Sequence, residues 1–396
     1  MKAAILVTHF TAERAGRAEV AGGGRPRMVR DLARYFVSRG IAVDVYERHR
    51  TESSFELEPG IEVRRVRTPV SAWGDLVFAL ETRARLADYD LCCYASPEDG
   101  FPFFAGKRAF AMQHGIWWDS PAHGWARRKI TAAVQAVRNL AMCRATAAVL
   151  CVDTNFINYL RLLGPSGNEA ARNCFYIPNY ADLDEFPAPD ERIIRRRFEQ
   201  RRLVFLRRFE PPRGGPLFVE VCERLCRRGF EFQALIAGWG SEEQRVRAMV
   251  ASNPELTRRV TFQAAGLDSA GTILGGAALS VVPTLWSEGT SLSAIESIVS
   301  GVPVVASDVG GLGNLILPGF NGAVCGVRAD DFAAAIEQML SNWEAYSRLA
   351  RHCLSMREEL SRQRWIAAVE QLLGRAGLLA LPAPARETEP LAVTRL

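Results

Sequence analysis

Short apolar runs alternate with stretches of helical periodicity along almost the whole chain. This alternation constrains the fold more than any other feature, because parallel strands need long crossover connections and these are usually helices. In the first half, strands are predicted at residues 3–8, 42–46, 61–66, 90–94, 108–113, 147–152 and 174–177. In the second half, strands are predicted at residues 203–207, 232–237, 259–262, 279–282, 303–306 and 322–325. The sequence therefore predicts an α/β protein with two doubly wound, Rossmann-like sheets.

A stretch rich in proline and aspartate separates the two series of strands. Residues 178–189, PNYADLDEFPAP, show no periodicity, which is typical of an interdomain hinge. We therefore expect an N-terminal domain over residues 1–185 and a C-terminal domain over residues 186–375. The last residues, 376–396, are rich in proline and alanine and are expected to be a disordered tail.

Composition excludes several classes of protein. The 396 residues are 48% hydrophobic and 23% charged, which fits neither a disordered chain nor a collagen or coiled coil. No apolar run is long enough for a membrane span, and we expect the first residues to form a buried strand rather than a signal peptide. The nine cysteines form no Cys-x-x-Cys pair, so we expect neither a disulfide framework nor a zinc site. A cytoplasmic location is expected.

The net charge of +5 is too small to indicate a nucleic-acid-binding protein. The charge is uneven, because the segment 191–213 contains nine arginines and only three glutamates. Arginine greatly outnumbers lysine, which suggests a GC-rich bacterial genome.

The segment from Pro283 to Gly311 is the most informative part of the sequence. A predicted strand leads into a turn with Glu288, and Thr290 or Ser291 is suited to cap a helix that ends near Gly301. Such a helix start presents unpaired backbone N–H groups to an anion such as a phosphate. Glu288 and Glu296 would stand about 12 Å apart on a helix, too far for the paired carboxylates of a glycosidase.

This segment resembles the Glu-x7-Glu motif of the retaining glycosyltransferases of family 4. Members of that family have the GT-B fold, in which two Rossmann-like domains face each other across a cleft. The resemblance implies that Glu296 binds the ribose hydroxyls of a donor nucleotide and that Glu288 lies near the transferred sugar. It also implies that backbone amides contact the distal phosphate at Gly289, Thr290, Ser291 and Leu292. The turn reads Glu-Gly-Thr-Ser here, where the family usually has Glu-Gly-Phe-Gly.

The sequence FLRRFEPPRGG resembles a second family signature, an arginine followed five residues later by a lysine. The matching positions are Arg208 and Arg213, so an arginine replaces the lysine. Two cations at this spacing would neutralise a diphosphate and stabilise the charge that develops as the sugar leaves.

Glycines and a histidine match further landmarks of the family. AGWG contains Gly238, which would line the nucleotide pocket, and the loop before the first long helix contains Gly23 and Gly24, which would face the donor phosphates. His114 follows a predicted strand, where the family has a histidine that contacts the donor sugar near the acceptor. Trp117, Trp118 and Asp119 follow, and they suit either an acceptor pocket or the core.

The resemblance implies no resident cofactor, with a nucleoside diphosphate sugar as co-substrate. The aspartate pairs at 88 and 90 and at 182 and 184 mimic the Asp-x-Asp metal site of the other glycosyltransferase fold. GT-B enzymes use cationic side chains and helix amides in place of that metal, so no divalent ion is expected.

We therefore expect transfer of a hexose-type sugar to a hydroxyl acceptor, which would be a glycan, a lipid-linked molecule or a small molecule. Envelope polysaccharide and natural-product biosynthesis remain equally open. The alternatives are a nucleotide-sugar epimerase or glycosyl phosphorylase on the same fold, and a non-catalytic subunit that binds sugar nucleotides. A nucleic-acid binder is disfavoured by the mild charge and the absence of an aromatic-basic motif.

Residues 125–144 leave a further alternative open. Five basic residues stand among alanines, valines and leucines there, a pattern that fits either an ordinary packed helix or an amphipathic helix on a membrane surface. Peripheral contact with the inner membrane face is therefore a second possible location.

Overall fold

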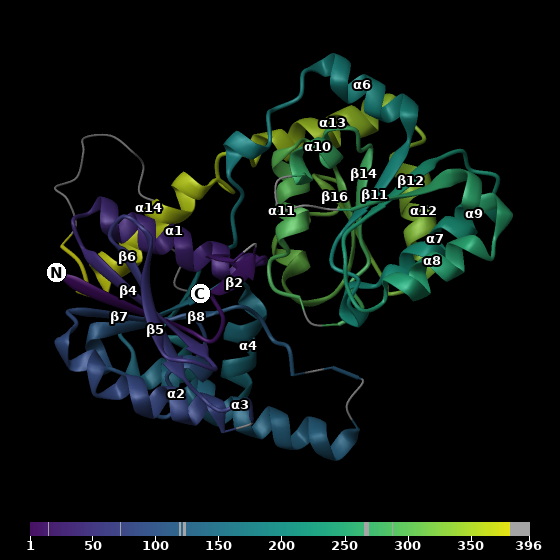
Figure 1. Ribbon diagram of the computed structural model, residues 1–396. Helices are drawn as coiled ribbons and strands as arrows, with labels where there is room; N and C mark the ends of the chain where they lie inside the picture. The colour runs from purple at the N-terminus through teal and green to yellow at the C-terminus, as the bar shows by residue number, and fades with distance from the viewer. Residues whose placement is uncertain are drawn as a thin grey trace. The chain divides into compact units, whose positions relative to one another are not determined.

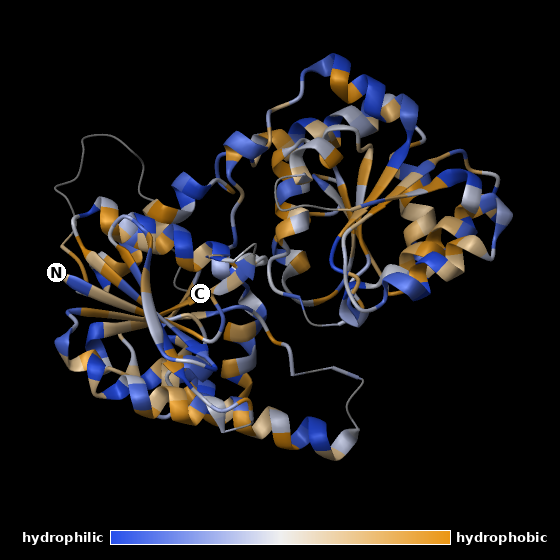
Figure 2. Ribbon diagram, viewed as in Figure 1, coloured by the Kyte–Doolittle hydropathy of each residue, from blue (hydrophilic) through white to orange (hydrophobic). Residues whose placement is uncertain are grey.

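The computed structural model describes residues 1–14, 16–71, 73–118, 120–121, 124–264, 269–286 and 288–380. The chain forms two compact units, and both contain a predominantly parallel sheet covered by helices (Figure 1). The strands are mostly apolar, as Figure 2 shows, because helices cover both faces of each sheet. The prediction of two doubly wound α/β sheets is confirmed.

The first unit contains an eight-stranded sheet in the order β10-β9-β8-β7-β1-β4-β6-β5. Its strands are β1 (Lys2–Val7), β4 (Ala42–His49), β5 (Ser53–Glu58), β6 (Ile61–Arg67), β7 (Leu91–Tyr94), β8 (Ala109–Gln113), β9 (Ala148–Cys151) and β10 (Cys174–Tyr176). The seven predicted strands of this half are all present, whereas β5 was not predicted. It pairs antiparallel with β6 at the edge of the sheet. A separate hairpin of β2 (Thr11–Arg14) and β3 (Arg17–Val20) was also missed.

The helices of this unit are α1 (Gly24–Ser38), α2 (Gly74–Arg83), α3 (Trp125–Ala145), α4 (Thr154–Leu162), α5 (Pro165–Ala171) and α14 (Arg362–Arg375). Helix α1 packs on β1, β4 and β6. It ends before Gly40, whose φ of 73° is a left-handed conformation that glycine adopts without strain. Among the described residues of the chain, no helix combines the length and the apolar character needed to cross a bilayer.

The second unit contains a six-stranded parallel sheet in the order β13-β12-β11-β14-β15-β16. Its strands are β11 (Arg202–Leu206), β12 (Gln233–Ala237), β13 (Val260–Gln263), β14 (Leu279–Val282), β15 (Val304–Ser307) and β16 (Gly322–Cys325). Its helices are α6 (Glu191–Gln200), α7 (Gly215–Arg227), α8 (Glu243–Ala251), α9 (Pro254–Arg259), α10 (Ala270–Gly275), α11 (Leu292–Val299), α12 (Ala329–Met339) and α13 (Trp343–Ser355). All six strands predicted for this half are present.

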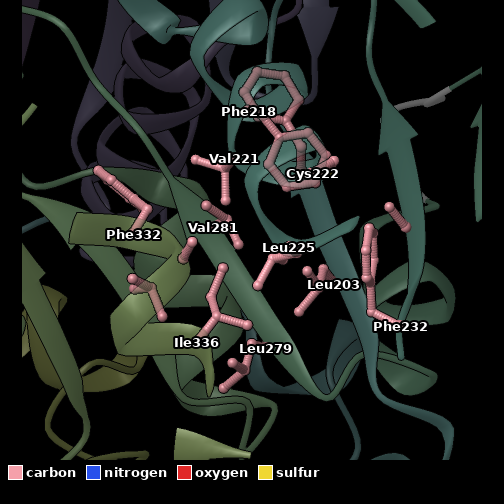
Figure 3. Close-up of a cluster of buried hydrophobic side chains, with 14 of the residues drawn as sticks. Leu203, Phe218, Val221, Cys222, Leu225, Phe232, Leu279, Val281, Phe332 and Ile336 are labelled. Carbon is pink, nitrogen blue, oxygen red and sulfur yellow. The ribbon is translucent and has the colours of Figure 1, made fainter. Parts of the chain in front are cut away.

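Two buried layers of side chains hold the second sheet between its helices. On one face, residues of α7 and α12 pack against β11 and β14, and Figure 3 shows Phe218, Leu225 and Ile336 among them. On the other face, residues of α10 and α11 pack against the same two strands. Close packing on both faces fixes the ends of the strands, where the loops begin.

The division of the chain differs from the predicted domains at three points. A short segment that begins at Gly115, inside the predicted N-terminal domain, is grouped with the second unit. The first unit ends at Ile177 and the second begins at Pro178, rather than after residue 185. The chain then returns to the first unit after Trp365, so α14 begins in the second unit and most of it belongs to the first, not to the C-terminal domain. Glu370 of α14 forms an ion pair with Arg39 at the end of α1, with 3.5 Å between Oε1 and Nη2. Most of the predicted tail, from residue 381, lies outside the described residues.

Each sheet has a point where the strand order reverses. In the second unit the strands follow the order 3-2-1-4-5-6, counted along the chain, so the reversal lies between β11 and β14. In the first unit the reversal lies between β1 and β7. Open α/β sheets bind ligands outside the carboxyl ends of the strands at this point, because neighbouring loops diverge to opposite faces and leave a crevice.

A buried carboxylate lies at the reversal point of the first sheet. The Asp99 carboxylate accepts hydrogen bonds from Thr8 Oγ1 at 2.5 Å, just after β1, and from Ser96 Oγ at 2.8 Å, just after β7. Burial raises the pKa of Asp99 from 3.8 to about 6, although the charge of Arg25 and the two hydroxyl groups oppose this shift. The folded protein therefore binds more protons than the unfolded chain between pH 3.8 and about 6.

This shift predicts that Asp99→Asn stabilises the fold above pH 6. The amide that replaces the carboxylate can accept from one hydroxyl and donate to the other, and it removes the cost of a buried charge. We expect a gain of about 1 to 3 kcal/mol in the free energy of unfolding at pH 7. The gain should shrink through the window between pH 6 and 4 and vanish below it. Urea unfolding at several pH values measures this. Asp88→Asn, at an exposed site, is the control, and a gain that does not change with pH would contradict the assignment.

Candidate active site

Glu288 lies at the reversal point of the second sheet, in the loop after β14. Its Oε2 accepts hydrogen bonds from Arg207 Nη2, from Arg213 Nη1 at 2.7 Å and from Thr284 Oγ1 at 3.0 Å. Arg207 Nη1 also donates to Thr284 Oγ1, at 2.6 Å. The side chains of Glu288 and Arg207 are buried, which strengthens the attraction between their charges. We call these four residues the Glu288 cluster.

Close backbone contacts hold the two loops that carry the cluster. Arg213 ends a short 3-10 turn, Pro211–Arg213, and the Leu285 N–H donates to the Pro212 carbonyl at 2.9 Å. Gly214 follows with φ 73°, and a Cβ atom there would lie 1.8 Å from the Pro283 carbonyl oxygen. Only glycine fits this position, so the loop after β11 is fixed against the loop after β14.

The charges of the cluster stabilise one another. Burial alone would raise the pKa of Glu288, but the charges of Arg207 and Arg213 and hydrogen bonds from Arg207 and Thr284 lower it below 4.5. Burial lowers the pKa of Arg207, and Glu288 opposes that shift. The guanidinium of an arginine is not deprotonated in proteins, and the Glu288 carboxylate in contact with Arg207 favours its charged form. One carboxylate and two guanidinium groups leave a positive charge at this edge.

The turn after Glu288 leads directly into α11. Ser291 is the residue before the first helical position, which confirms one of the two predicted caps, and its side chain makes no capping hydrogen bond. The first amides of α11 therefore have no side-chain acceptor from their cap and retain the partial positive charge of a helix start. The Glu288 carbonyl accepts from the Gly311 N–H at 2.9 Å, which anchors the start of the turn. Gly289 and Leu292 are partly buried on either side of Thr290 and Ser291.

The hinge segment is bonded to this turn. The Asn179 N–H donates to Thr290 Oγ1 at 3.0 Å, and Asn179 Nδ2 donates to the Thr290 carbonyl at 2.6 Å. The Thr290 side chain is buried and holds the turn. If Thr290 contacts a phosphate, it therefore does so through its backbone N–H. Asn179 was not predicted as a site residue, because these contacts join positions far apart in the sequence.

Glu296 lies in the second turn of α11 and is partly buried. Its carbonyl accepts hydrogen bonds from the Ser300 N–H at 3.1 Å and from Ser300 Oγ at 2.7 Å, near the end of the helix. Glu288 and Glu296 thus belong to one continuous turn and helix, as predicted, but Glu288 is in the ion-pair cluster and Glu296 is on the helix.

The two neighbouring arginines after β11 have different environments. Arg208, the residue predicted from the family spacing, is exposed, whereas Arg207 is buried and contacts Glu288. Successive residues of an extended chain point to opposite sides, so only one of the two can reach the cluster. Arg207 was missed because the spacing to Arg213 selects Arg208. Strand β11 is a continuous apolar run, so no alternation in its sequence separates the two arginines.

The glycine loop after β12 lies against the same segment. Gly238 has φ 150°, and a Cβ there would approach the Arg207 carbonyl oxygen to 1.9 Å. The Phe209 N–H donates to the Trp239 carbonyl at 2.8 Å. Gly238 therefore permits a close backbone approach, as a glycine at a ligand edge does. The indole of Trp239, which was not predicted, is exposed between Gly238 and Gly240.

In the first unit, the glycine loop leads into α1. Gly23 is the residue before the helix, with φ 123°, and Gly24 is its first residue. The first turn contains no acidic residue, and Arg25 follows directly. This helix start is therefore suited to an anion, and a contact of Gly23 and Gly24 with the donor phosphates stays a prediction.

His114 follows β8 and is partly buried. Its Nε2 lies 2.9 Å from the Ala95 carbonyl oxygen, so Nε2 carries the proton and Nδ1 is an acceptor. Burial and the charge of Arg25 lower the pKa of His114 to about 3, and the bond to Ala95 opposes this shift. The imidazole is neutral at physiological pH. Trp118 is buried and Trp117 is exposed, while Asp119 lies outside the described residues.

No group of three or more metal-ligating side chains is found among the described residues. In the aspartate pairs, Asp90 Oδ2 accepts from the Lys2 N–H at 2.8 Å, and Asp182 Oδ2 lies 2.6 Å from Arg362 Nη1. Each of these two carboxylates thus has a partner within the protein.

Several known proteins are similar to this chain. D-inositol 3-phosphate glycosyltransferase of Geodermatophilus obscurus is 26% identical over 380 residues, which cover 83% of this chain and 80% of that protein. Sucrose-phosphate synthase of Thermosynechococcus elongatus has a similar structure, with a TM-score of 0.75 at 21% identity, over 94% of this chain and 98% of that one. HepE of Anabaena, in complex with UDP and glucose, has a TM-score of 0.67 at 16% identity, over 95% and 100% of the two chains.

Two family profiles match the sequence and together span most of it. Residues 22–185 match the profile described as Glycosyltransferase Family 4, and residues 200–342 match the one described as Glycosyl transferases group 1. The first match contains the glycine loop and His114, and the second contains the Glu288 cluster and α11. The chain belongs to glycosyltransferase family 4 and has the GT-B fold.

Proposed function

We propose that this enzyme is a retaining glycosyltransferase that moves a hexose-type sugar from a nucleoside diphosphate sugar to a hydroxyl acceptor. The observation that carries the proposal is the Glu288 cluster beside the start of α11. It places guanidinium groups and helix amides at the reversal point of a Rossmann-like sheet. Phosphates bind at such helix starts, and arginine pairs with phosphate oxygens through its planar fork.

The proposed roles follow from these positions. Arg208, which is exposed, and Arg213 neutralise the diphosphate, and the amides of the Gly289–Leu292 turn contact its distal phosphate. Glu296 binds the ribose hydroxyls, and Gly238 lets the nucleotide approach the loop after β12. Arg207 holds Glu288 in place beside the transferred sugar. Donors that are fixed before the reaction stabilise the developing charge without reorganisation.

No nucleophile is identified for a covalent intermediate, so we propose attack on the same face of the sugar. The departing phosphate takes the proton of the acceptor hydroxyl as the glycosidic bond to the donor breaks. The reaction needs no divalent ion in this proposal, because the cations and amides carry the charge. Neutral His114 and the Gly23–Gly24 loop serve the donor sugar and phosphates, as the family resemblance implies.

The biological setting is also a proposal. D-inositol 3-phosphate glycosyltransferase among the relatives and UDP and glucose in the HepE complex favour a nucleotide sugar as donor. We propose a bacterial enzyme of the cytoplasm, or of the inner membrane face, in envelope polysaccharide or natural-product biosynthesis. An epimerase or phosphorylase would release an isomer or a sugar phosphate instead, and a non-catalytic subunit would bind the donor without turnover.

A donor screen tests the ribose assignment. We expect one class among UDP-, GDP- and dTDP-sugars to raise the melting temperature, since ligand at 100 times its Kd adds about 2.7 kcal/mol of stability. Glu296→Ala should abolish the shift, because the ribose loses its carboxylate acceptor. Differential scanning fluorimetry measures both. Glu337→Ala on α12 is the control and should keep the shift; a Glu296→Ala protein that keeps it would disprove the assignment.

The two arginines after β11 should respond differently to substitution. Arg207→Met removes a buried partner of Glu288, and we expect a loss of about 2 to 4 kcal/mol in the free energy of unfolding. Arg208→Met should change that stability by less than about 0.5 kcal/mol, because the site is exposed. It should nevertheless weaken binding of the nucleoside diphosphate. Urea unfolding and calorimetric titration measure the two effects, and equal stability losses would show that Arg207 has no special role.

Glu288→Gln tests the ion pairs directly. The amide leaves two guanidinium groups without a carboxylate, so stability should fall by about 2 to 4 kcal/mol at pH 7. Because the pKa of Glu288 is lowered from 4.5 in the folded state, its contribution is complete above that pH and is lost as pH falls through the lowered value. The difference between wild type and variant should therefore narrow in acid. A constant difference from pH 7 down to pH 3 would contradict this prediction.

A further inference from the structure

Helix α3 leaves apolar side chains exposed between Trp125 and Val137. Trp125 is 75% exposed, Ile130 66%, Val134 45% and Val137 58%. In Figure 1 the first turns of α3 extend beyond the elements of their own unit, and in Figure 2 these turns carry both apolar and strongly polar residues. Exposed apolar residues are ordinary when single, but a group of them on one helix indicates a contact surface.

Helical geometry places three of these residues on one line. Ile130, Val134 and Val137 are separated by four and then three residues, so at about 100° per residue they form a stripe along one side of the helix. The residues that α3 buries are Gln135, Asn139, Met142 and Cys143. On the same helical wheel, these lie about half a turn away from the stripe. The stripe is therefore a second face, separate from the one that packs on the protein.

All the charged residues of α3 are basic. The helix contains five basic residues and no acidic one, as its sequence WARRKITAAVQAVRNLAMCRA shows. Arg127 and Lys129 lie on the two sides of the exposed stripe, and both are exposed, as is Arg128. Trp125 stands at the beginning of the helix. Basic residues beside an apolar stripe, with a tryptophan at the end, are typical of helices that lie in a membrane interface.

We propose that the exposed stripe of α3, formed by Ile130, Val134 and Val137, docks on an anionic lipid surface with Arg127 and Lys129 against the headgroups. The charge complementarity favours this occupant over a second copy of the chain. In a symmetric dimer the same patch would face itself, and the basic residues of the two copies would repel each other. The proposal concerns other residues than those of the nucleotide site and does not depend on that site.

Vesicle binding of the full chain tests the proposal. In co-sedimentation, the protein should bind phosphatidylcholine vesicles that contain one quarter phosphatidylglycerol and should bind pure phosphatidylcholine poorly. Raising the salt concentration should weaken the binding, because salt screens the attraction to the headgroups. Arg127→Gln with Lys129→Gln should lower the partition coefficient by about 30-fold, since each basic residue near the surface contributes about 1 kcal/mol.

A second variant removes the apolar contribution alone. Ile130→Ser with Val137→Ser should lower the partition coefficient by about tenfold or more while leaving the charges in place. Leu162→Ser is the matched control, because Leu162 is an 85% exposed apolar residue at the end of α4 and should have no effect. The melting temperature and the affinity for nucleoside diphosphate should be unchanged in all three proteins, which separates this test from that of the proposed function.

Three results would overturn the proposal. The first is equal binding to neutral and anionic vesicles. The second is binding that the stripe variants leave unchanged. The third is a dimer in light scattering that Ile130→Ser with Val137→Ser dissociates, since this would make a second copy the occupant of the stripe.

Discussion

The ion pairs of Glu288 with Arg207 and Arg213 hold the ligand edge of the second sheet together. They join the loop after β11 to the loop after β14, across more than seventy residues of sequence. A buried charge costs several kcal/mol unless it is paired, so each partner fixes the others. The same carboxylate residue begins the turn into α11, and its carbonyl is anchored by Gly311. The position of the helix amides therefore depends on this cluster.

The sequence was sufficient for most of the fold. Strands such as β1 and β14 are buried on both faces, so they appear as continuous apolar runs that are easy to recognise. The missed strand β5 has the sequence SSFELE and lies half-exposed at the sheet edge, with a polar composition that resembles a loop. The place of α14 in the first unit also escaped prediction, because it depends on a distant contact between Glu370 and Arg39.

Sequence analysis could predict only those residues of the candidate site that lie close together along the chain. Glu288 and the turn into α11 follow one another along the chain, so a motif could identify them. Arg207 differs, because a spacing rule cannot decide which of two adjacent arginines faces the cluster; the direction of each side chain at the end of β11 decides it. Asn179 could be predicted only if the contact between the hinge segment and Thr290 were known. Asp99 could be predicted only if the strand order of the first sheet were known.

The two reversal points share a topology but differ in their electrostatics. At the second, guanidinium groups lower the pKa of a buried carboxylate and leave a surplus of positive charge. At the first, hydroxyl groups donate to Asp99 and its pKa is raised to about 6, His114 is neutral, and Arg25 supplies a single positive charge that acts on both groups. Fixed cations suit phosphate oxygens, whereas neutral donors and acceptors suit sugar hydroxyls. We infer that the second sheet edge is specialised for the diphosphate, whereas the first combines neutral partners for hydroxyl groups with a helix start that suits an anion, a difference that strand order alone would not produce.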